Sequence, residues 1–185
     1  MKFLTTPISG LVVIEPEIFN DERGWFIESF NLQRFRIGLQ ALELEAPDCF
    51  VQDNLSNSKK GVVRGLHYQL APFAQGKLVS ALHGAVFDVA VDLRVDSSTY
   101  GEWFALELSD VNKKMLWVPA GFAHGFLALE DDTCVSYKVT QYYNKDSERS
   151  VLWSDTSLGI QWPALSEYFI SDKDKSASAF LKLSG

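Results

Sequence analysis

Cysteine is scarce in this sequence of 185 residues, with only Cys49 and Cys134 present. The two form no Cys-x-x-Cys pair, which argues against a thioredoxin-like redox motif and against a zinc knuckle. Widely separated cysteines are more typical of free thiols in a reducing compartment than of a disulfide. We therefore expect two buried free thiols.

Basic residues are outnumbered, with 17 Lys and Arg against 24 Asp and Glu, for a formal net charge of −7. This balance argues against general nucleic-acid binding, which needs a broad basic surface, but a few converging cations could still hold a small anion. No apolar stretch reaches the length of a membrane-spanning helix. Residues 1–13, interrupted by Pro7 and Gly10, do not fit a signal peptide. We expect a cytoplasmic protein that binds neither nucleic acid nor membrane.

Short apolar stretches separated by turn residues dominate the chain, which is 46% hydrophobic and 13% aromatic. This composition predicts a well-packed core, and the length suits one domain over residues 1–185. Asn31 can cap a helix over 31–44, where apolar residues recur at helical spacing. Many short strands predict an all-β sandwich or jelly-roll barrel with little helix. The predicted strands cover 11–15, 25–30, 50–54, 62–69, 77–83, 85–94, 102–108, 114–118, 125–128 and 133–140.

Alternation within 85–94 predicts a half-buried strand, since Phe87 and Val89 alternate with Asp88 and Ala90. Beyond Trp153 the sequence loosens into a tail rich in Ser and Asp.

Three polar residues lie within one strand–turn–strand unit, Arg64, His67 and Lys77. A base that titrates near neutrality and two cations are what a site needs to form and hold an anion. Residues three apart in a regular strand point to opposite faces. If Arg64 and His67 face one pocket, Gly65 must carry a β-bulge that resets the alternation.

A second polar motif, Pro119-Ala-Gly-Phe-Ala-His124, has the Pro-x-Gly-x-x-His spacing of the second cupin motif, in which the histidine ligates a metal. Metal binding would also need a His-x-His pair with a carboxylate beyond it. The three histidines, His67, His83 and His124, contain no such pair. We therefore expect no metal, and a metal-dependent cupin is kept as an alternative.

Tyr137 shares a predicted strand face with Val135 and Val139, so its ring should point to the interior. It could be a core tyrosine with a satisfied hydroxyl. In a cup-shaped barrel the same face lines the ligand cavity, and there a phenol can donate a proton.

Taken together, these segments closely resemble the dTDP-4-dehydrorhamnose 3,5-epimerase family, in order and over nearly the whole chain. The matching segments are Glu15-Pro, Asp21-Glu-Arg-Gly, Glu28-Ser-Phe, Phe50-Val-Gln-Asp-Asn, Arg64-Gly-Leu-His-Tyr-Gln, Gln75-Gly-Lys-Leu-Val, Val86-Phe-Asp-Val-Ala-Val-Asp-Leu-Arg, Trp117-Val-Pro-Ala-Gly-Phe-Ala-His-Gly-Phe, Tyr137-Lys, Tyr142-Tyr and Ser171-Asp-Lys-Asp.

The resemblance implies a cupin-type jelly-roll barrel with a few short flanking helices, and metal-free, cofactor-free epimerisation of a 4-keto-6-deoxy sugar on dTDP. It implies His67 as the base, Asp174 as the carboxylate that orients it, Tyr137 as the acid and Lys77 as the group that stabilises the enolate. The substrate-binding residues it implies are Arg23, Phe26, Glu28, Gln52, Asn54, Arg64, His124, Tyr143, Glu148 and Lys173. Of these, Arg23, Phe26 and Glu28 belong to an N-terminal segment that reaches the partner's nucleotide site in a homodimer.

Chemistry is consistent with these implied roles. Inverting a carbon requires proton removal on one face and delivery on the other. Histidine suits removal near neutral pH, and a phenol with an ordinary pKa of about 10 stays protonated for delivery. We favour inversion at both C3 and C5, which gives dTDP-4-dehydro-L-rhamnose, with inversion at one carbon as the alternative. The resemblance implies that the product serves the synthesis of rhamnose for surface polysaccharide. A nucleotide-sugar binding module without catalysis is a further alternative, but binding alone has no use for an acid opposite a base.

Overall fold

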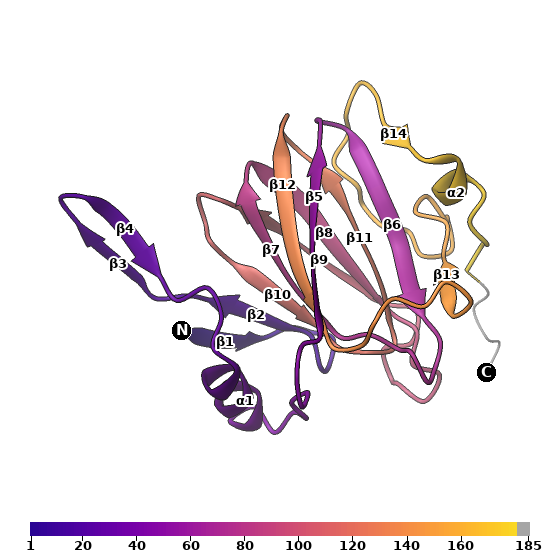
Figure 1. The fold of residues 1–185 in the computed structure, drawn as a ribbon. Coiled ribbons are helices and arrows are strands. Elements are labelled where there is room, and N and C mark those ends of the chain that lie inside the picture. The colour runs from indigo at the N-terminus through magenta and orange to yellow at the C-terminus, as the bar shows by residue number, and fades with distance from the viewer. Residues whose placement is uncertain (181–185) are drawn as a thin grey trace.

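The computed structural model describes residues 1–180, which form two facing β-sheets with a hairpin projecting from one end (Figure 1). The first sheet has the strand order β1–β2–β10–β7–β12–β5, and the second the order β13–β6–β11–β8–β9, with β14 parallel to β6. The first sheet comprises β1 (Lys2–Thr5), β2 (Val12–Glu15), β10 (Met115–Val118), β7 (Lys77–His83), β12 (Thr133–Val139) and β5 (Gln52–Ser58). The second comprises β13 (Glu148–Ser150), β6 (Val62–Gln69), β11 (Phe122–Ala128), β8 (Ala85–Asp92), β9 (Trp103–Ser109) and β14 (Phe169–Ile170).

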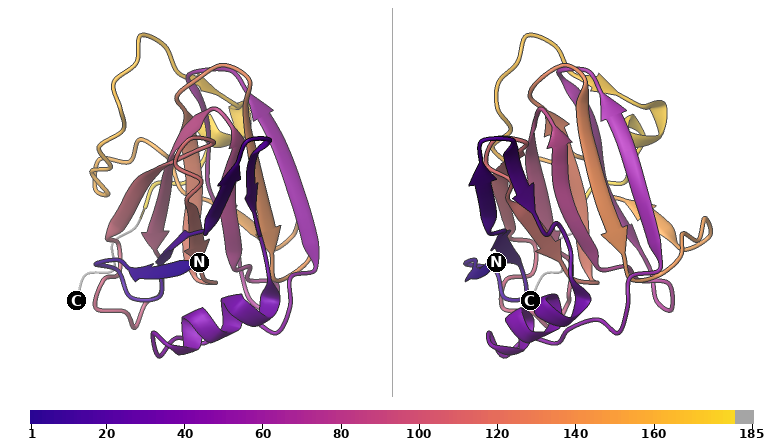
Figure 2. Two further views of the ribbon diagram at one scale, coloured as in Figure 1. Left: turned by 90° about the vertical axis from the view of Figure 1, so that its left-hand side faces the viewer. Right: turned by 60° about the vertical axis from the view of Figure 1, so that its left-hand side comes forward.

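Three elements lie outside the two sheets. Strands β3 (Ile18–Asp21) and β4 (Gly24–Ile27) form the projecting hairpin. Helix α1 (Leu32–Gln40) lies beside β1, and helix α2 (Asp172–Lys175) lies on the outer side of β6 (Figures 1 and 2). The arrangement is the predicted all-β, cupin-like jelly roll with short flanking helices.

The main core fills the space between the sheets. Val79 and Val135 from the first sheet meet Val86, Ala90 and Phe126 from the second, all at most 4% exposed. Because aliphatic side chains fill this part of the space between the sheets, a ligand can bind only where polar side chains replace them.

The outer faces of both sheets are also covered. Phe35 and Leu39 of α1 pack on Val12 and Trp117 of the first sheet. On the second sheet, residues after β13, including Val151 and Leu158, pack on Leu66, Val89 and Val91. The Ser- and Asp-rich tail therefore contributes β14, α2 and part of this layer.

The prediction of a half-buried strand over 85–94 was wrong in its exposure. Asp88 and Asp92 are both 0% exposed, because β8 lies in the middle of its sheet and is packed on both faces. The side chains of β8 do alternate between two faces, but both faces are buried. Asp92 is satisfied by Arg94 and by the hydroxyls of Ser97 and Thr99.

Several element boundaries also differ from prediction. The helix begins after Asn31, whose side chain accepts from the Arg34 N–H as expected, but it ends at Gln40 because the chain turns through Glu43 at a φ of 59°. β5 extends to Ser58, and β11 begins at Phe122. β1, β3, β13, β14 and α2 were not predicted.

Both cysteines are free, yet Cys49 is exposed rather than buried.

No helix within residues 1–180 is both long enough and apolar enough to span a bilayer.

Candidate functional site

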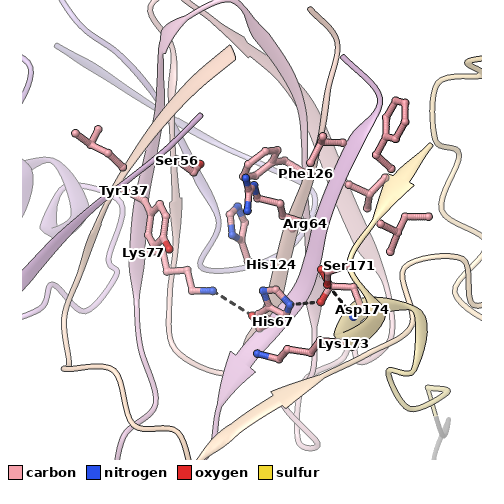
Figure 3. A pocket seen from close by; sticks show the side chains of 16 residues that line it. Ser56, Arg64, His67, Lys77, His124, Phe126, Tyr137, Ser171, Lys173 and Asp174 are labelled. Carbon is pink, nitrogen blue, oxygen red and sulfur yellow. Dashed lines mark hydrogen bonds and ion pairs between the residues drawn. The ribbon is translucent and has the colours of Figure 1, made fainter. Parts of the chain in front are cut away.

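A cavity of about 590 Å³ opens between the two sheets (Figure 3). One wall comes from β6 and β11, the opposite wall from β5, β7 and β12, and the C-terminal segment closes one side. The polar residues that line it are Ser56, Arg64, His67, Lys77, His124, Tyr137, Ser171, Lys173 and Asp174. Most of these polar groups were predicted from the sequence as site residues.

A β-bulge at Gly65 brings Arg64 and His67 to the same cavity, as predicted. His67 pairs with His124 and Arg64 with Phe126, so three steps along β6 match two along β11. Gly65 has a φ of 123°, and a Cβ there would lie 2.6 Å from the Gly125 Cα. Only glycine fits this position, because a side chain would meet both a disfavoured backbone conformation and the neighbouring strand.

His67 and Asp174 form a close pair. His67 Nε2 lies 2.6 Å from Asp174 Oδ1, and the carboxylate is only 4% exposed. The Ser171 side chain caps α2 by accepting from the Asp174 N–H, which fixes the residue relative to the cavity. With Nε2–H donating to the carboxylate, Nδ1 of His67 carries the lone pair of a base.

Burial by itself would raise the pKa of Asp174, but its interactions lower it below the ordinary value. The lowering comes from the hydrogen bond and the charge of His67, and from bonds with the Gly65 N–H and Ser171. Asp174 is therefore an anion at neutral pH, suited to orienting an imidazole and stabilising its protonated form.

Lys77 is a buried cation at the centre of the site. Its Nζ donates to the His67 carbonyl oxygen at 3.1 Å, and the residue is 8% exposed. Burial lowers the pKa of Lys77 from 10.5 to about 8, although the charges of Asp88 and Glu148 act in the opposite direction. The ammonium form is still the major one at pH 7.

Tyr137 lies on the wall opposite His67, on the same strand face as the buried Val135 and Val139 (Figure 3). Burial raises the pKa of its phenol, and the charge of Arg64 partly counters that effect. Tyr137 is therefore protonated at neutral pH and able to donate.

His124 is 7% exposed, and its Nε2 lies 3.0 Å from both carboxylate oxygens of Asp88. Asp88 was not predicted as a site residue. Its only signal was a carboxylate on a regular strand face, and that signal was assigned to solvent. Arg64 donates to Ser58 Oγ at 3.1 Å and to the Asn57 carbonyl oxygen at 3.1 Å.

A second cavity of about 330 Å³ shares His67, Lys77 and Tyr137 with the first. Its remaining residues include four predicted binding residues, Gln52, Asn54, Tyr143 and Glu148. Glu148 accepts from the Tyr143 hydroxyl at 3.0 Å and from Lys173 Nζ at 2.6 Å. The two cavities are therefore adjacent, and we call them together the polar channel.

Three predicted binding residues are not brought to this channel. Arg23 and Phe26 lie on the projecting hairpin, where Arg23 pairs with Asp21 and Phe26 is 66% exposed. Glu28 follows the hairpin and pairs with Arg34. Figure 1 shows the hairpin on the far side of the molecule from α2.

Within residues 1–180, no group of three or more His, Cys, Asp and Glu side chains is arranged to hold a metal ion. His83, the third histidine, pairs with Asp110 and lies in neither cavity.

Comparisons with known proteins identify the family of this chain. The family model described as dTDP-4-dehydrorhamnose 3,5-epimerase matches residues 5–182. The dTDP-4-dehydrorhamnose 3,5-epimerase of Shigella flexneri is 49% identical over 181 residues, which are 98% of this chain and 97% of that protein.

Solved structures show the same fold. A dTDP-6-deoxy-D-glucose-3,5-epimerase from Legionella pneumophila, in complex with dTDP-4-keto-L-rhamnose, is 47% identical with a TM-score of 0.89, over 96% of this chain and 92% of that one. A 3'-monoepimerase from Streptomyces bikiniensis, in complex with dTDP-quinovose, is 33% identical with a TM-score of 0.87, over 97% and 87%. The chain belongs to the dTDP-4-dehydrorhamnose 3,5-epimerase family and is an isomerase of nucleotide-sugar biosynthesis.

Proposed function

We propose that this epimerase inverts C3 and C5 of dTDP-4-dehydro-6-deoxy-D-glucose to give dTDP-4-dehydro-L-rhamnose, without a metal or other cofactor. The observation that carries the proposal is the placement of His67 and Tyr137 on opposite walls of one cavity, with Lys77 beside them. The Legionella relative that binds dTDP-4-keto-L-rhamnose supports the choice of substrate class.

The first half of each inversion is proton removal. Nδ1 of His67 takes the proton from the carbon next to the C4 ketone, and the electron pair moves to the ketone oxygen as an enolate. Asp174 holds Nε2–H and stabilises the imidazolium that forms. The Lys77 ammonium stabilises the enolate oxygen, and one such donor is worth about 3 kcal/mol of barrier.

The second half is proton delivery from the other face. The enolate re-forms the ketone as its carbon takes the Tyr137 hydroxyl proton. Tyr137 and His67 then return to their starting protonation states by exchange with solvent. The same pair acts on the second carbon once that carbon is presented to them. Arg64, His124, Gln52, Asn54, Tyr143, Glu148 and Lys173 hold the sugar and the dTDP group along the channel.

Deuterium incorporation tests this reaction directly. Incubation with the 4-keto sugar nucleotide in deuterated water is expected to place deuterium at both C3 and C5, read by NMR. Absence of label at both carbons would refute epimerase chemistry on this substrate.

Inversion at a single carbon is the second candidate, because a 3'-monoepimerase shares the fold at 33% identity. Label at C3 or C5 alone would select it. The higher identity to proteins named 3,5-epimerases favours the double reaction.

We also propose that the chain is a homodimer in which the β3–β4 hairpin, with Arg23, Phe26 and Glu28, completes the nucleotide site of the partner. Support comes from the exposed aromatic side chains of the hairpin, since Phe19, Trp25 and Phe26 are 51%, 56% and 66% exposed. An apolar surface of this kind marks an interaction site.

Complementation tests this dimer. His67→Asn and Arg23→Ala are each expected to have little activity, and a co-expressed equal mixture is expected to recover about a quarter of wild-type activity. Half of the dimers would be mixed, and each mixed dimer would hold one intact site. If the hairpin served the site of its own chain, no mixed dimer would contain an intact site and activity would stay low.

A further inference from the structure

The inward face of β5 carries a row of four polar side chains, Gln52, Asn54, Ser56 and Ser58. Burial alternates along this strand, and these four are the less exposed members. β5 lies at the edge of the first sheet and pairs with β12, so the row borders the same channel as Tyr137.

Three of the four have partners within the protein. Gln52 Nε2 donates to Asn54 Oδ1 at 2.8 Å, and Ser58 Oγ accepts from Arg64 Nε at 3.1 Å. Ser56 Oγ is buried and makes no hydrogen bond to any residue of the described chain, 1–180. Buried hydroxyls are nearly always paired, and leaving one unpaired costs roughly 1–3 kcal/mol. This cost points to a partner that binds from the cavity.

The position of Ser56 identifies which part of a ligand it would meet. It lines the larger cavity, beside Tyr137 and across from Arg64 (Figure 3), and it does not line the smaller cavity of Gln52, Tyr143 and Glu148. In the register it is opposite Val135, two pairs along from the Asn54–Tyr137 pair and on the same face of the sheet. A proton donor for a sugar carbon must approach the ring itself, so a side chain at this depth faces the hexose rather than the nucleoside.

We propose that the Ser56 hydroxyl binds a ring hydroxyl of the hexose and thereby contributes to recognition of the sugar. This assignment rests on the proposed function of the site. Rotation about χ1 between staggered positions turns Oγ from the wall to the ligand, and such positions differ little in energy for serine. A hydroxyl that both donates and accepts suits a sugar hydroxyl, which does the same.

The test is binding of two unreactive probes to the intact protein by calorimetry, dTDP and dTDP-glucose. Ser56→Ala is expected to weaken dTDP-glucose binding about three- to tenfold, the effect of one neutral hydrogen bond, while dTDP binding stays unchanged. The melting temperature of the free protein should not fall and should rise if anything, because no internal hydrogen bond is lost and an unpaired buried hydroxyl is removed. With the 4-keto substrate, KM should rise by the same factor as the dTDP-glucose Kd.

Ser80→Ala is the matched control, since Ser80 is a partly buried strand serine of the same sheet that lines neither cavity. It should leave both probes and turnover unchanged. Equal weakening of dTDP and dTDP-glucose by Ser56→Ala would overturn the proposal in favour of a diphosphate contact. No change in either probe, or a lowered melting temperature, would overturn it in favour of a purely structural serine. Absence of deuterium incorporation by the wild type would instead refute the reaction, and the probe measurements would still decide the role of Ser56.

Discussion

Replacing Lys77 by methionine should make the protein more stable and much less active at pH 7. Lys77 is buried, and burial lowers its pKa from 10.5 to about 8. At pH 7 the lysine is charged in both the folded and the unfolded chain, so the folded state carries the full cost of burying an ammonium. The difference between the two pKa values corresponds to about 3 kcal/mol.

Methionine removes that cost but also removes the hydrogen bond to the His67 carbonyl oxygen, which is worth about 1 kcal/mol. The free energy of unfolding of Lys77→Met should therefore exceed that of the wild type by about 2 kcal/mol at pH 7. As pH rises from 8 toward 10.5, the folded wild type loses the proton while the unfolded chain keeps it. Wild-type stability then rises, and the advantage of the variant should shrink by about 2 kcal/mol between pH 7 and pH 9.5.

Urea denaturation measures this difference in the free energy of unfolding. Both proteins are compared at one fixed concentration, because subunit association makes the measured stability depend on concentration. Activity should fall about 10²- to 10³-fold through loss of the enolate donor. For the wild type, kcat/KM should decline above pH 8, about tenfold per pH unit, as the ammonium is lost. A variant that is less stable than the wild type by the same amount at both pH values would show that Lys77 carries no buried-charge cost, and the reasoning would fail.

Three further substitutions address the other parts of the site. Tyr137→Phe should retain dTDP binding and lower kcat about 10²- to 10⁴-fold, measured by calorimetry and NMR turnover, because only the donated proton is lost; unchanged kcat would assign the acid elsewhere. Asp174→Asn should lower kcat by a similar factor and change the tautomer of His67, visible in imidazole ¹⁵N shifts, since an amide can donate to Nε2; wild-type shifts and kcat would contradict the orienting role. Gly65→Ala should destabilise the fold by more than 2 kcal/mol in urea denaturation, because its Cβ would lie 2.6 Å from the Gly125 Cα; a stable variant would show that the bulge tolerates a side chain.

The strands that could be predicted from the sequence are those whose side chains alternate or that are bounded by turn residues. β6 and β7 were predicted with their observed bounds, Val62–Gln69 and Lys77–His83. The bulge at Gly65 also followed from sequence reasoning, because a glycine between two residues that must share a face is the one place where alternation can reset.

The C-terminal segment could not be predicted, because its structure depends on contacts far along the chain. β14 has two residues and α2 has four, so neither has a detectable period. Both are held by β6, through the parallel pairing of Ile170 with Val63 and the bond between Asp174 and His67, 107 residues apart. Only the family resemblance pointed to Asp174.

Asp88 was missed for a different physical reason. Its strand alternates as a half-exposed strand does, and the sequence does not reveal that both faces are covered. The face of Asp88 and Ala90 is covered by the other sheet, and the face of Val89 and Val91 by the C-terminal layer. A carboxylate that is 0% exposed requires a partner. His124, the one histidine already singled out on a turn motif, supplies it. The inference that was available from the sequence was to pair Asp88 with His124.

The sandwich architecture itself explains why this fold suits inversion of a carbon. The proposed base, His67, comes from β6 of one sheet, and the proposed acid, Tyr137, comes from β12 of the other. Two facing sheets lie about 10 Å apart, which leaves room for a sugar ring only where large side chains are absent from the space between them. A sugar ring bound at that place, as proposed, would have its two faces contacted by two different sheets. Lys77 lies next to β12 on β7, and its bond to the His67 carbonyl oxygen links the two sheets across the cavity. In the proposed mechanism, proton removal and delivery on opposite faces are therefore assigned to groups that the two sheets already hold on opposite walls of the cavity.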